Sequence, residues 1–240
     1  MDIQRCMQGL LELLQKYNVR APQDALFSAD GAFTAAGRTV RLLPWRQERR
    51  LIEMKKLLHG GQAGMPCVLR TGRIVPRADG LKAQLRRELD VSEWLFESEA
   101  ASVYMVQSGG AANLIVRLKN GVVCTLELAA TLKEGAAVLD RHEINTRRGV
   151  ISDRAVDTQV PQASVYTFCE SGAHSYTDVD FELYGLLPEE AACVRSAFEL
   201  LQRGAWDEYA KREARIDALC AAAQKSAAEN RRVFLTGEGM

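Results

Sequence analysis

The middle of the chain consists of short segments in which apolar and polar residues alternate, separated by glycine turns. Ser102–Gln107, Asn113–Leu118 and Val122–Ala129 are separated by Gly109-Gly110 and by Lys119-Asn120-Gly121. Alternation with a period of two indicates strands that bury one face, and an Asn-Gly pair favours a type I′ hairpin turn. The segments therefore predict adjacent antiparallel strands, which is the strongest constraint on the fold.

Segments of helical periodicity flank this region on both sides. The predicted helices are Ile3–Tyr17, Arg46–Leu58, Leu81–Phe96, Pro188–Arg203 and Trp206–Glu229. The remaining predicted strands are Ala25–Ser28, Arg38–Pro44, Pro66–Val75, Asp140–Thr146, Val150–Val156, Ser164–Phe168, Tyr176–Leu183 and Arg232–Leu235. Helices at the two ends with hairpins between them favour an α+β fold: a mostly antiparallel open sheet, helices packed on one face, and no complete Rossmann domain.

The charges of the chain balance, which excludes two classes of partner. There are 31 basic and 31 acidic residues among 240, so no excess of cations is available to neutralise a phosphate backbone. No apolar run reaches the roughly 18 residues that a membrane span needs. We therefore expect neither a nucleic-acid nor a membrane partner.

The six cysteines form no C-x-x-C pair and show no metal-knuckle spacing. Cys124 lies in a predicted strand, and Cys193 and Cys220 lie in alanine-rich helical stretches. Free thiols that pack as small apolar groups explain this usage, and they are typical of a reducing cytoplasm. The expected location is cytoplasmic.

The predicted hairpin has two different faces. One face of the second strand is apolar, with Val122, Cys124, Leu126 and Leu128, and suits packing under helices. The other face of the hairpin is mixed and carries Asn113, Ile115, Arg117, Val123, Thr125 and Glu127. Such a face suits a wet surface, a ligand floor or a subunit interface. We take it as the candidate ligand or interface face and expect a homodimer through it, with Arg117 and Glu127 fixing the register across a two-fold axis.

Histidines offer little chemistry in the sequence. His142 shares a strand face with Asp140, whereas Glu143 points the other way. The pair would suit a metal ion, but no third ligand can be identified, so no metal site is predicted. His59 at a helix C-terminus and His174 in a Ser/Gly loop are expected to be solvated.

Acidic residues alternate with apolar ones before the last two helices. The acidic set is Asp178, Asp180 and Glu182. This pattern predicts a half-buried edge strand with an acidic outer face. Neighbouring carboxylates repel one another, so basic side chains from an adjacent strand or subunit are expected to face them.

Three stretches resemble the C-terminal domain of Gfo/Idh/MocA-type oxidoreductases, the family of glucose–fructose oxidoreductase and inositol dehydrogenase. They are RQERRLIEMKKLLHGGQAGMP (Arg46–Pro66), the hairpin NLIVRLKNGVVCTLELAAT with the later HEINTRRGVI, and IDALCAAAQKSAAENRRVFL (Ile216–Leu235). The resemblance implies that residues 46–240 form this α+β domain. Residues 1–45 would then be a remnant or replacement of the family's nucleotide-binding domain.

The family's catalytic and cofactor motifs have no counterpart in the sequence. There is no G-x-G-x-x-G turn to hold a dinucleotide and no E-K-P motif with its catalytic lysine. The aspartate and histidine of the family's D-x-x-x-H motif fall on Ala83 and Arg87. Alanine does not ionise, and arginine does not exchange a proton near neutral pH. We therefore assign no catalytic, cofactor-binding or metal residue and expect no bound cofactor.

These features lead to two hypotheses about function. The first is a truncated, non-catalytic relative of NAD(P)-dependent sugar or polyol oxidoreductases that acts as a binding or assembly subunit. The second is an oxidoreductase subunit completed in trans by a separately encoded nucleotide-binding partner, which would dock on Met1–Trp45. Hydride transfer by the chain alone is not expected under either hypothesis.

Overall fold

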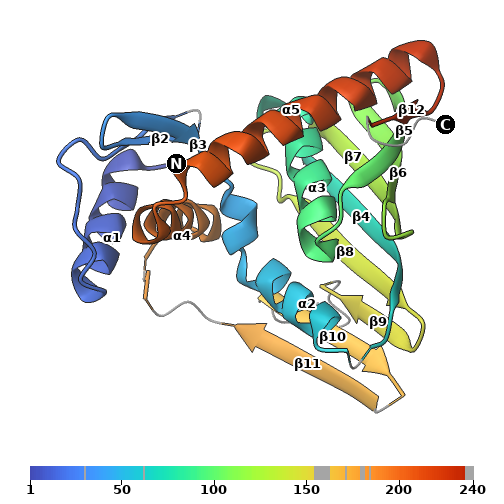
Figure 1. Ribbon diagram of the computed structural model, residues 1–240, viewed down its shortest axis with the longest axis horizontal. Coiled ribbons are helices and arrows are strands. Elements are labelled where there is room, and N and C mark those ends of the chain that lie inside the picture. The colour runs from blue at the N-terminus through green and yellow to red at the C-terminus, as the bar shows by residue number, and fades with distance from the viewer. Residues whose placement is uncertain are drawn as a thin grey trace. The chain divides into compact units, whose positions relative to one another are not determined.

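The computed structural model describes residues 1–29, 31–61, 63–153, 163–170, 172–178, 182–183 and 185–235, and the chain forms two compact units. We call Met1–Ile52 with Val179–Arg215 the small unit, and Glu53–Asp178 with Ile216–Met240 the sheet unit (Figure 1). Each unit is therefore assembled from two separate stretches of the sequence. The expected division after residue 45 stays a prediction.

The small unit is built on two helices and a three-stranded sheet. Its elements are α1 (Ile3–Lys16), β1 (Leu26–Phe27), β2 (Ala32–Ala35), β3 (Arg38–Arg41), the 3₁₀ turn η1 (Pro44–Gln47), the start of α2 (Arg49–His59), α4 (Pro188–Arg203) and the start of α5 (Trp206–Glu229). Asp2 caps α1 by accepting a hydrogen bond from the Arg5 amide at 3.1 Å. Gly9 lets α1 approach α4 closely, because a side chain there would meet Leu186 and Val194.

The sheet unit holds an open sheet of nine described strands. They are β4 (Pro66–Pro76), β5 (Ala100–Ser108), β6 (Ala111–Leu118), β7 (Val123–Leu132), β8 (Leu139–Thr146), β9 (Gly149–Ser152), β10 (Ala163–Cys169), β11 (Gly172–Asp178) and β12 (Val233–Phe234). Their order across the sheet is β11-β10-β9-β8-β4-β7-β6-β5-β12. Only the central β4–β7 pair is parallel among these strands. The predicted α+β fold with a mostly antiparallel open sheet is thus confirmed.

Helix α3 (Leu81–Phe96) covers one face of this sheet, which we call the inner face (Figure 1). The alternation in β6 and β7 follows the prediction: Leu114, Val116, Cys124 and Leu126 are buried on the inner face. Burying side chains of this size stabilises the fold by about 1.5–3 kcal/mol for each of the larger ones. The C-terminal half of α5 also contacts the sheet, where the Ser226 hydroxyl accepts a hydrogen bond from the Met105 amide at 3.0 Å.

One predicted turn differs from expectation. Gly109 and Gly110 both have positive φ and form a two-residue loop between β5 and β6, as a type I′ turn requires. In the Asn120-Gly121 turn only Gly121 has positive φ, at 90°, so the prediction of a type I′ turn there is wrong. The Leu118 amide reaches the Val122 carbonyl at 2.9 Å, which gives a three-residue loop with glycine in the bulge position.

Further differences concern short or edge elements. The sequence pattern did not predict β2, and the helix expected from Arg46 begins as η1 with α2 starting at Arg49. His174 lies in β11 rather than in a loop, and it is exposed. The predicted strand 176–183 is observed as Gly172–Asp178, and residues 154–156 of another predicted strand lie outside the described residues.

The predicted acidic strand is not formed as expected. Asp180 lies outside the described residues, and Glu182 belongs to the small unit rather than to a sheet strand. Its carboxylate accepts hydrogen bonds from Lys16 and Tyr17, both at 2.6 Å, and from Arg195 at 3.1 Å. Basic partners therefore do face this carboxylate, but they come from α1 and α4.

The cysteines are free thiols in the structure. Cys6, Cys124 and Cys220 are buried, Cys169 and Cys193 are partly buried, and Cys67 is exposed. Burial raises the pKa of the Cys124 thiol to about 12, so this thiol stays protonated and inert. Among the described helices, none combines the length and the apolar character that crossing a bilayer demands.

Candidate functional site

Helix α3 is unusual because charged residues are buried on most of its circumference. Arg86, Arg87, Glu88, Asp90 and Glu93 are all buried. A buried charge is tolerated only with partners, and the structure supplies them within the sheet unit. Arg86 pairs with Asp217 of α5, and the Glu93 carboxylate accepts a hydrogen bond from the Ala100 amide at 2.7 Å.

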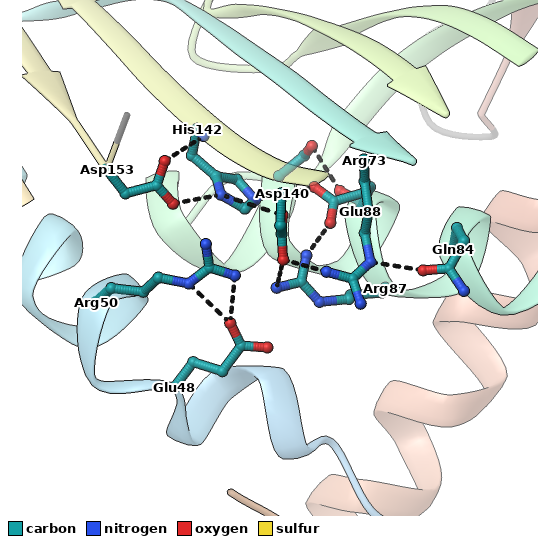
Figure 2. A network of polar contacts seen from close by, with 10 residues as sticks. Glu48, Arg50, Arg73, Gln84, Arg87, Glu88, Asp140, His142 and Asp153 are labelled. Atoms are coloured by element: carbon teal, nitrogen blue, oxygen red, sulfur yellow. Dashed lines mark hydrogen bonds and ion pairs between the residues drawn. The ribbon is translucent and has the colours of Figure 1, made fainter. Parts of the chain in front are cut away.

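His142 of β8 lies between two carboxylates under α3 (Figure 2). Its Nδ1 atom is 2.8 Å from Asp153 Oδ2, and its Nε2 atom is 3.2 Å from Glu88 Oε2. Asp153 is held in place because its other oxygen accepts the His142 backbone N–H at 2.6 Å. His142 and Glu88 are fully buried.

Two arginines complete the group. Arg87 contacts Glu88 Oε1 and Asp140 Oδ2, the latter at 3.1 Å, and its side chain is 5% exposed. Arg73 of β4 also pairs with Asp140 and donates from Nε to Gln84 at 2.6 Å (Figure 2). We call this set the His142 cluster; its members are Arg73, Arg87, Glu88, Asp140, His142 and Asp153.

Charges of opposite sign lie next to one another in the His142 cluster. Three carboxylates and two guanidinium groups belong to it, and the His142 imidazole lies between Asp153 and Glu88. Burial alone would lower the pKa of His142, but Asp153 and Glu88 outweigh burial and raise it far above its ordinary value. Burial alone would raise the pKa of Glu88, but Arg87 and His142 outweigh it and lower that pKa. Glu88 is therefore ionised.

The two positions onto which the sequence resemblance places the family's catalytic pair differ in their surroundings. Ala83 is exposed on the first turn of α3. Arg87 is buried within the His142 cluster, where its guanidinium contacts Glu88 and, on β8, Asp140.

The predicted candidate face lies on the opposite, open side of the sheet. Asn113, Ile115, Arg117 and Glu127 are exposed, and Val123 and Thr125 are partly buried. Strand register extends this face into two rows across β6, β7, β4 and β8. One row is Asn113, Glu127, Gly72 and Arg141, and the next is Ile115, Thr125, Arg70 and Glu143. Arg117 and Glu127 are on adjacent strands but two rows apart, because Arg117 is opposite Val123 and Glu127 is opposite Asn113.

This open face contains a hollow of about 540 Å³. Its lining includes Arg70, Gly72, Asn113, Thr125, Glu127, Arg141 and Glu143. Gly72 contributes to the hollow because a Cβ added there would meet no atom within 4 Å. Arg70 Nη1 lies 3.6 Å from Glu143 Oε1, so the charges on this face are arranged in opposite-sign neighbours.

Sequence reasoning found part of these sites and missed the rest. It placed Asp140 and His142 on one strand face but found no third ligand; the structure adds Glu88 from α3 and Asp153 from the end of β9. The available signal was α3 itself, because a helix with charges all round it and apolar residues between them must bury some of those charges. No local signal pointed to Asp153.

Comparisons with known proteins establish the fold. No protein-family model and no curated protein match the sequence. Solved structures do match: a putative oxidoreductase from Thermotoga maritima shares 15% identity with a TM-score of 0.62 and covers 82% of this chain and 63% of its own. A second is an oxidoreductase from Agrobacterium radiobacter in complex with NAD⁺, L-tartaric acid and magnesium, at 14% identity and a TM-score of 0.65, covering 81% of this chain and 64% of its own.

A third matching structure is the scyllo-inositol dehydrogenase of Lactobacillus casei with bound NAD(H) and scyllo-inositol. It shares 17% identity with a TM-score of 0.58 and covers 81% of this chain and 64% of its own. Over the matched part, the fold is that of these structures, which are Gfo/Idh/MocA-type oxidoreductases. The resemblance noted in the sequence is confirmed at this level. This chain spans about 63–64% of the length of these neighbours with the Gfo/Idh/MocA fold.

Proposed function

We propose that the chain is a non-catalytic binding and assembly subunit that uses the Gfo/Idh/MocA fold, and that it pairs with a second copy through the open face of its sheet. The observation that supports a non-catalytic subunit is the set of contacts made by Arg87. This residue stands where the family resemblance places the acid/base histidine, and its guanidinium is held between Glu88 and Asp140. A guanidinium stays protonated near neutral pH and cannot relay a proton during hydride transfer.

The open face supports the second half of the proposal. An interface between two identical copies must be complementary to itself, and this face alternates charges of opposite sign around an apolar residue. Ile115 is 44% exposed at the centre of the face. A two-fold axis that runs across the strands at Ile115 would exchange the rows on either side, which brings Arg117 toward Glu127 of the partner subunit. Such a contact would bury on the order of 800 Å² per subunit.

Substitution of Ile115 tests this assembly. Ile115→Arg would place two arginines beside each other across the axis, so the dimer should dissociate while the inner face stays folded. Leu11→Arg is the matched control, because Leu11 is also 44% exposed but lies on α1 of the small unit. Light scattering at tens of micromolar should give twice the 26.6 kDa chain mass for wild type and Leu11→Arg, and the chain mass for Ile115→Arg. A wild-type monomer overturns the assembly proposal.

The second candidate is an oxidoreductase completed in trans by a nucleotide-binding partner. It is favoured by the solved neighbours, which extend beyond the part that this chain matches and some of which are described with bound NAD⁺ or NADH. Under this proposal, the chain would gain nicotinamide-dependent polyol or sugar oxidation only when the partner is added. Co-purification followed by mass spectrometry identifies such a partner, and an assay of the reconstituted pair separates this candidate from the first.

A further inference from the structure

The contact between His142 and Glu88 requires a positive atom at its centre. The Nδ1 atom of His142 already faces Asp153, which holds the Nδ1–H by a hydrogen bond at 2.8 Å. The remaining ring nitrogen, Nε2, then presents a lone pair to Glu88 Oε2 at 3.2 Å. Two acceptors at that distance repel each other, so either a proton or a metal ion lies between them.

The spacing of these two atoms suits a metal ion. Two ligands on a tetrahedral zinc ion at 2.0–2.1 Å lie about 3.3 Å apart. Asp140 adds a third ligand, since one ligand atom each from Glu88, Asp140 and His142 can be chosen within 4.8 Å of one another.

Arg87 contacts one oxygen of each of two carboxylates beside the histidine. Arg87 contacts Oε1 of Glu88 and Oδ2 of Asp140. The opposite oxygen of each carboxylate lies on the histidine side: Glu88 Oε2 is 3.2 Å from Nε2, and Asp140 Oδ1 is 3.8 Å from Nδ1. The guanidinium therefore orients both carboxylates with one oxygen each toward His142.

A threonine beside the histidine provides an independent sign of a missing ligand. Thr71 of β4 is opposite His142 in the strand register and belongs to the same inner face. Thr71 is 4% exposed, and within the described part of the chain its hydroxyl oxygen has no hydrogen-bond partner. A buried hydroxyl left in this state is unfavourable, and a bound ion or an ordered water is the usual explanation.

We propose that the His142 cluster binds one divalent transition-metal ion of the zinc class, with His142 Nε2, Glu88 and Asp140 as ligands. The Thr71 hydroxyl, on the residue opposite His142 in the strand register, is the candidate partner of a fourth ligand such as water. Asp153 is a positioning residue, because its hydrogen bond to Nδ1 fixes the tautomer and leaves Nε2 for the metal. Binding displaces the proton between Nε2 and Glu88, so one proton is released for each metal ion bound.

The test measures metal in the full-length protein. Wild-type protein expressed in zinc-supplemented medium and passed through metal-free buffer should retain about one zinc per chain by mass spectrometry. His142→Gln and Glu88→Gln should lose it, and Asp153→Asn should bind about 10–100-fold more weakly. His174→Gln is the matched control, since His174 is an exposed histidine of the same unit and its loss should leave the zinc content unchanged.

A spectroscopic readout separates this site from surface binding. Protein refolded from denaturant and chelator with Co²⁺ should show the visible bands of a low-coordinate site in wild type and in His174→Gln, and none in His142→Gln. The proposal is overturned if wild type holds no zinc as purified and gives no such bands after refolding. A proton would then lie between His142 Nε2 and Glu88 Oε2. Zinc content unchanged in His142→Gln also overturns it. Should a variant not fold, the wild-type measurements decide.

Discussion

Glu88 of α3 and His142 of β8 are separated by 54 residues in sequence, yet their Oε2 and Nε2 atoms lie 3.2 Å apart in a fully buried contact. This contact joins a helix to the sheet that it covers by charge rather than by apolar packing alone. Because each charge of the cluster is compensated by its neighbours, removal of a single member leaves an uncompensated charge in the interior.

Arg87→Met should therefore destabilise the sheet unit. The substitution keeps most of the side-chain volume but leaves Glu88 and Asp140 without this cation, and breaking a buried pair in this way costs about 3–5 kcal/mol. Lys82→Met is the control, because Lys82 is exposed on the same helix and its loss should stay within about 0.5 kcal/mol. Denaturant unfolding of the three proteins gives the free energies. Equal stability of the two variants would show that the ion pairs do not support the fold.

Gly149→Ala should disrupt the pairing of β9 with β10. A Cβ at this position would lie 2.0 Å from the Phe168 carbonyl oxygen and 2.8 Å from the Cys169 Cα, so the two strands must separate. We expect a loss of about 3 kcal/mol and faster hydrogen exchange of the β10 amides. Gly72→Ala serves as the control, since its Cβ would enter open space at a φ that alanine tolerates. Unchanged exchange in Gly149→Ala would contradict this register.

Glu182 should make the small unit less stable in acid. The hydrogen bond from Lys16, followed by those from Tyr17 and Arg195, lowers the pKa of Glu182 to about 2 from an ordinary value of 4.5. A lowered folded-state pKa stabilises the fold above the unfolded-state pKa, and this contribution is lost as pH falls from about 4.5 to about 2. The stability difference between wild type and Glu182→Gln, measured by urea unfolding, should therefore be larger at pH 7 than at pH 3. In a Lys16→Gln background the pH dependence of this stability difference should become smaller. An unchanged pH dependence would show that other carboxylates cause it.

NAD(H) or NADP(H) should not raise the melting temperature of the chain by itself. A ligand at 100 times its dissociation constant adds about 2.7 kcal/mol of stability, which shifts the melting temperature by a few degrees for a protein of this size. The scyllo-inositol dehydrogenase of Lactobacillus casei, whose structure holds NAD(H), provides the positive control. A reproducible upward shift of this chain would argue against a cofactor-free subunit.

Local sequence patterns predicted most helices and strands, because periodicity reports which face of an element is buried. The bounds of α3 follow the prediction, since Leu85, Leu89 and Leu95 recur at helical spacing and a glycine precedes the helix. Strand β2 was not predicted, because the turn that pairs it with β3 contains Ala36 and Gly37 rather than an Asn-Gly pair. Asp24 stabilises that turn by accepting both backbone N–H groups at 2.7 Å, a contact made 12 and 13 residues away.

The candidate site was less predictable, because its members meet only in three dimensions. The alternation in β8 identified Asp140 and His142 as neighbours on one face. Glu88 could not be joined to them without knowing that α3 packs on β7 and β4, beside β8, and that placement depends on β4 entering the sheet between β7 and β8. Strand order is a property of tertiary packing, so the parallel β4–β7 pair had no signature in either segment.

The split composition of the small unit constrains the order in which the chain acquires structure during synthesis. Helix α1 is synthesised before its partner α4, which begins only at Pro188, after the first segment of the sheet unit has been made. Until then the apolar side of α1, with Leu10, Leu13 and Leu14, cannot be buried against α4. Domains generally fold as units once their sequence is complete. The nascent chain therefore carries an uncovered apolar helix from the completion of α1 until α4 has been made, and this is the interval in which a chaperone would act on it.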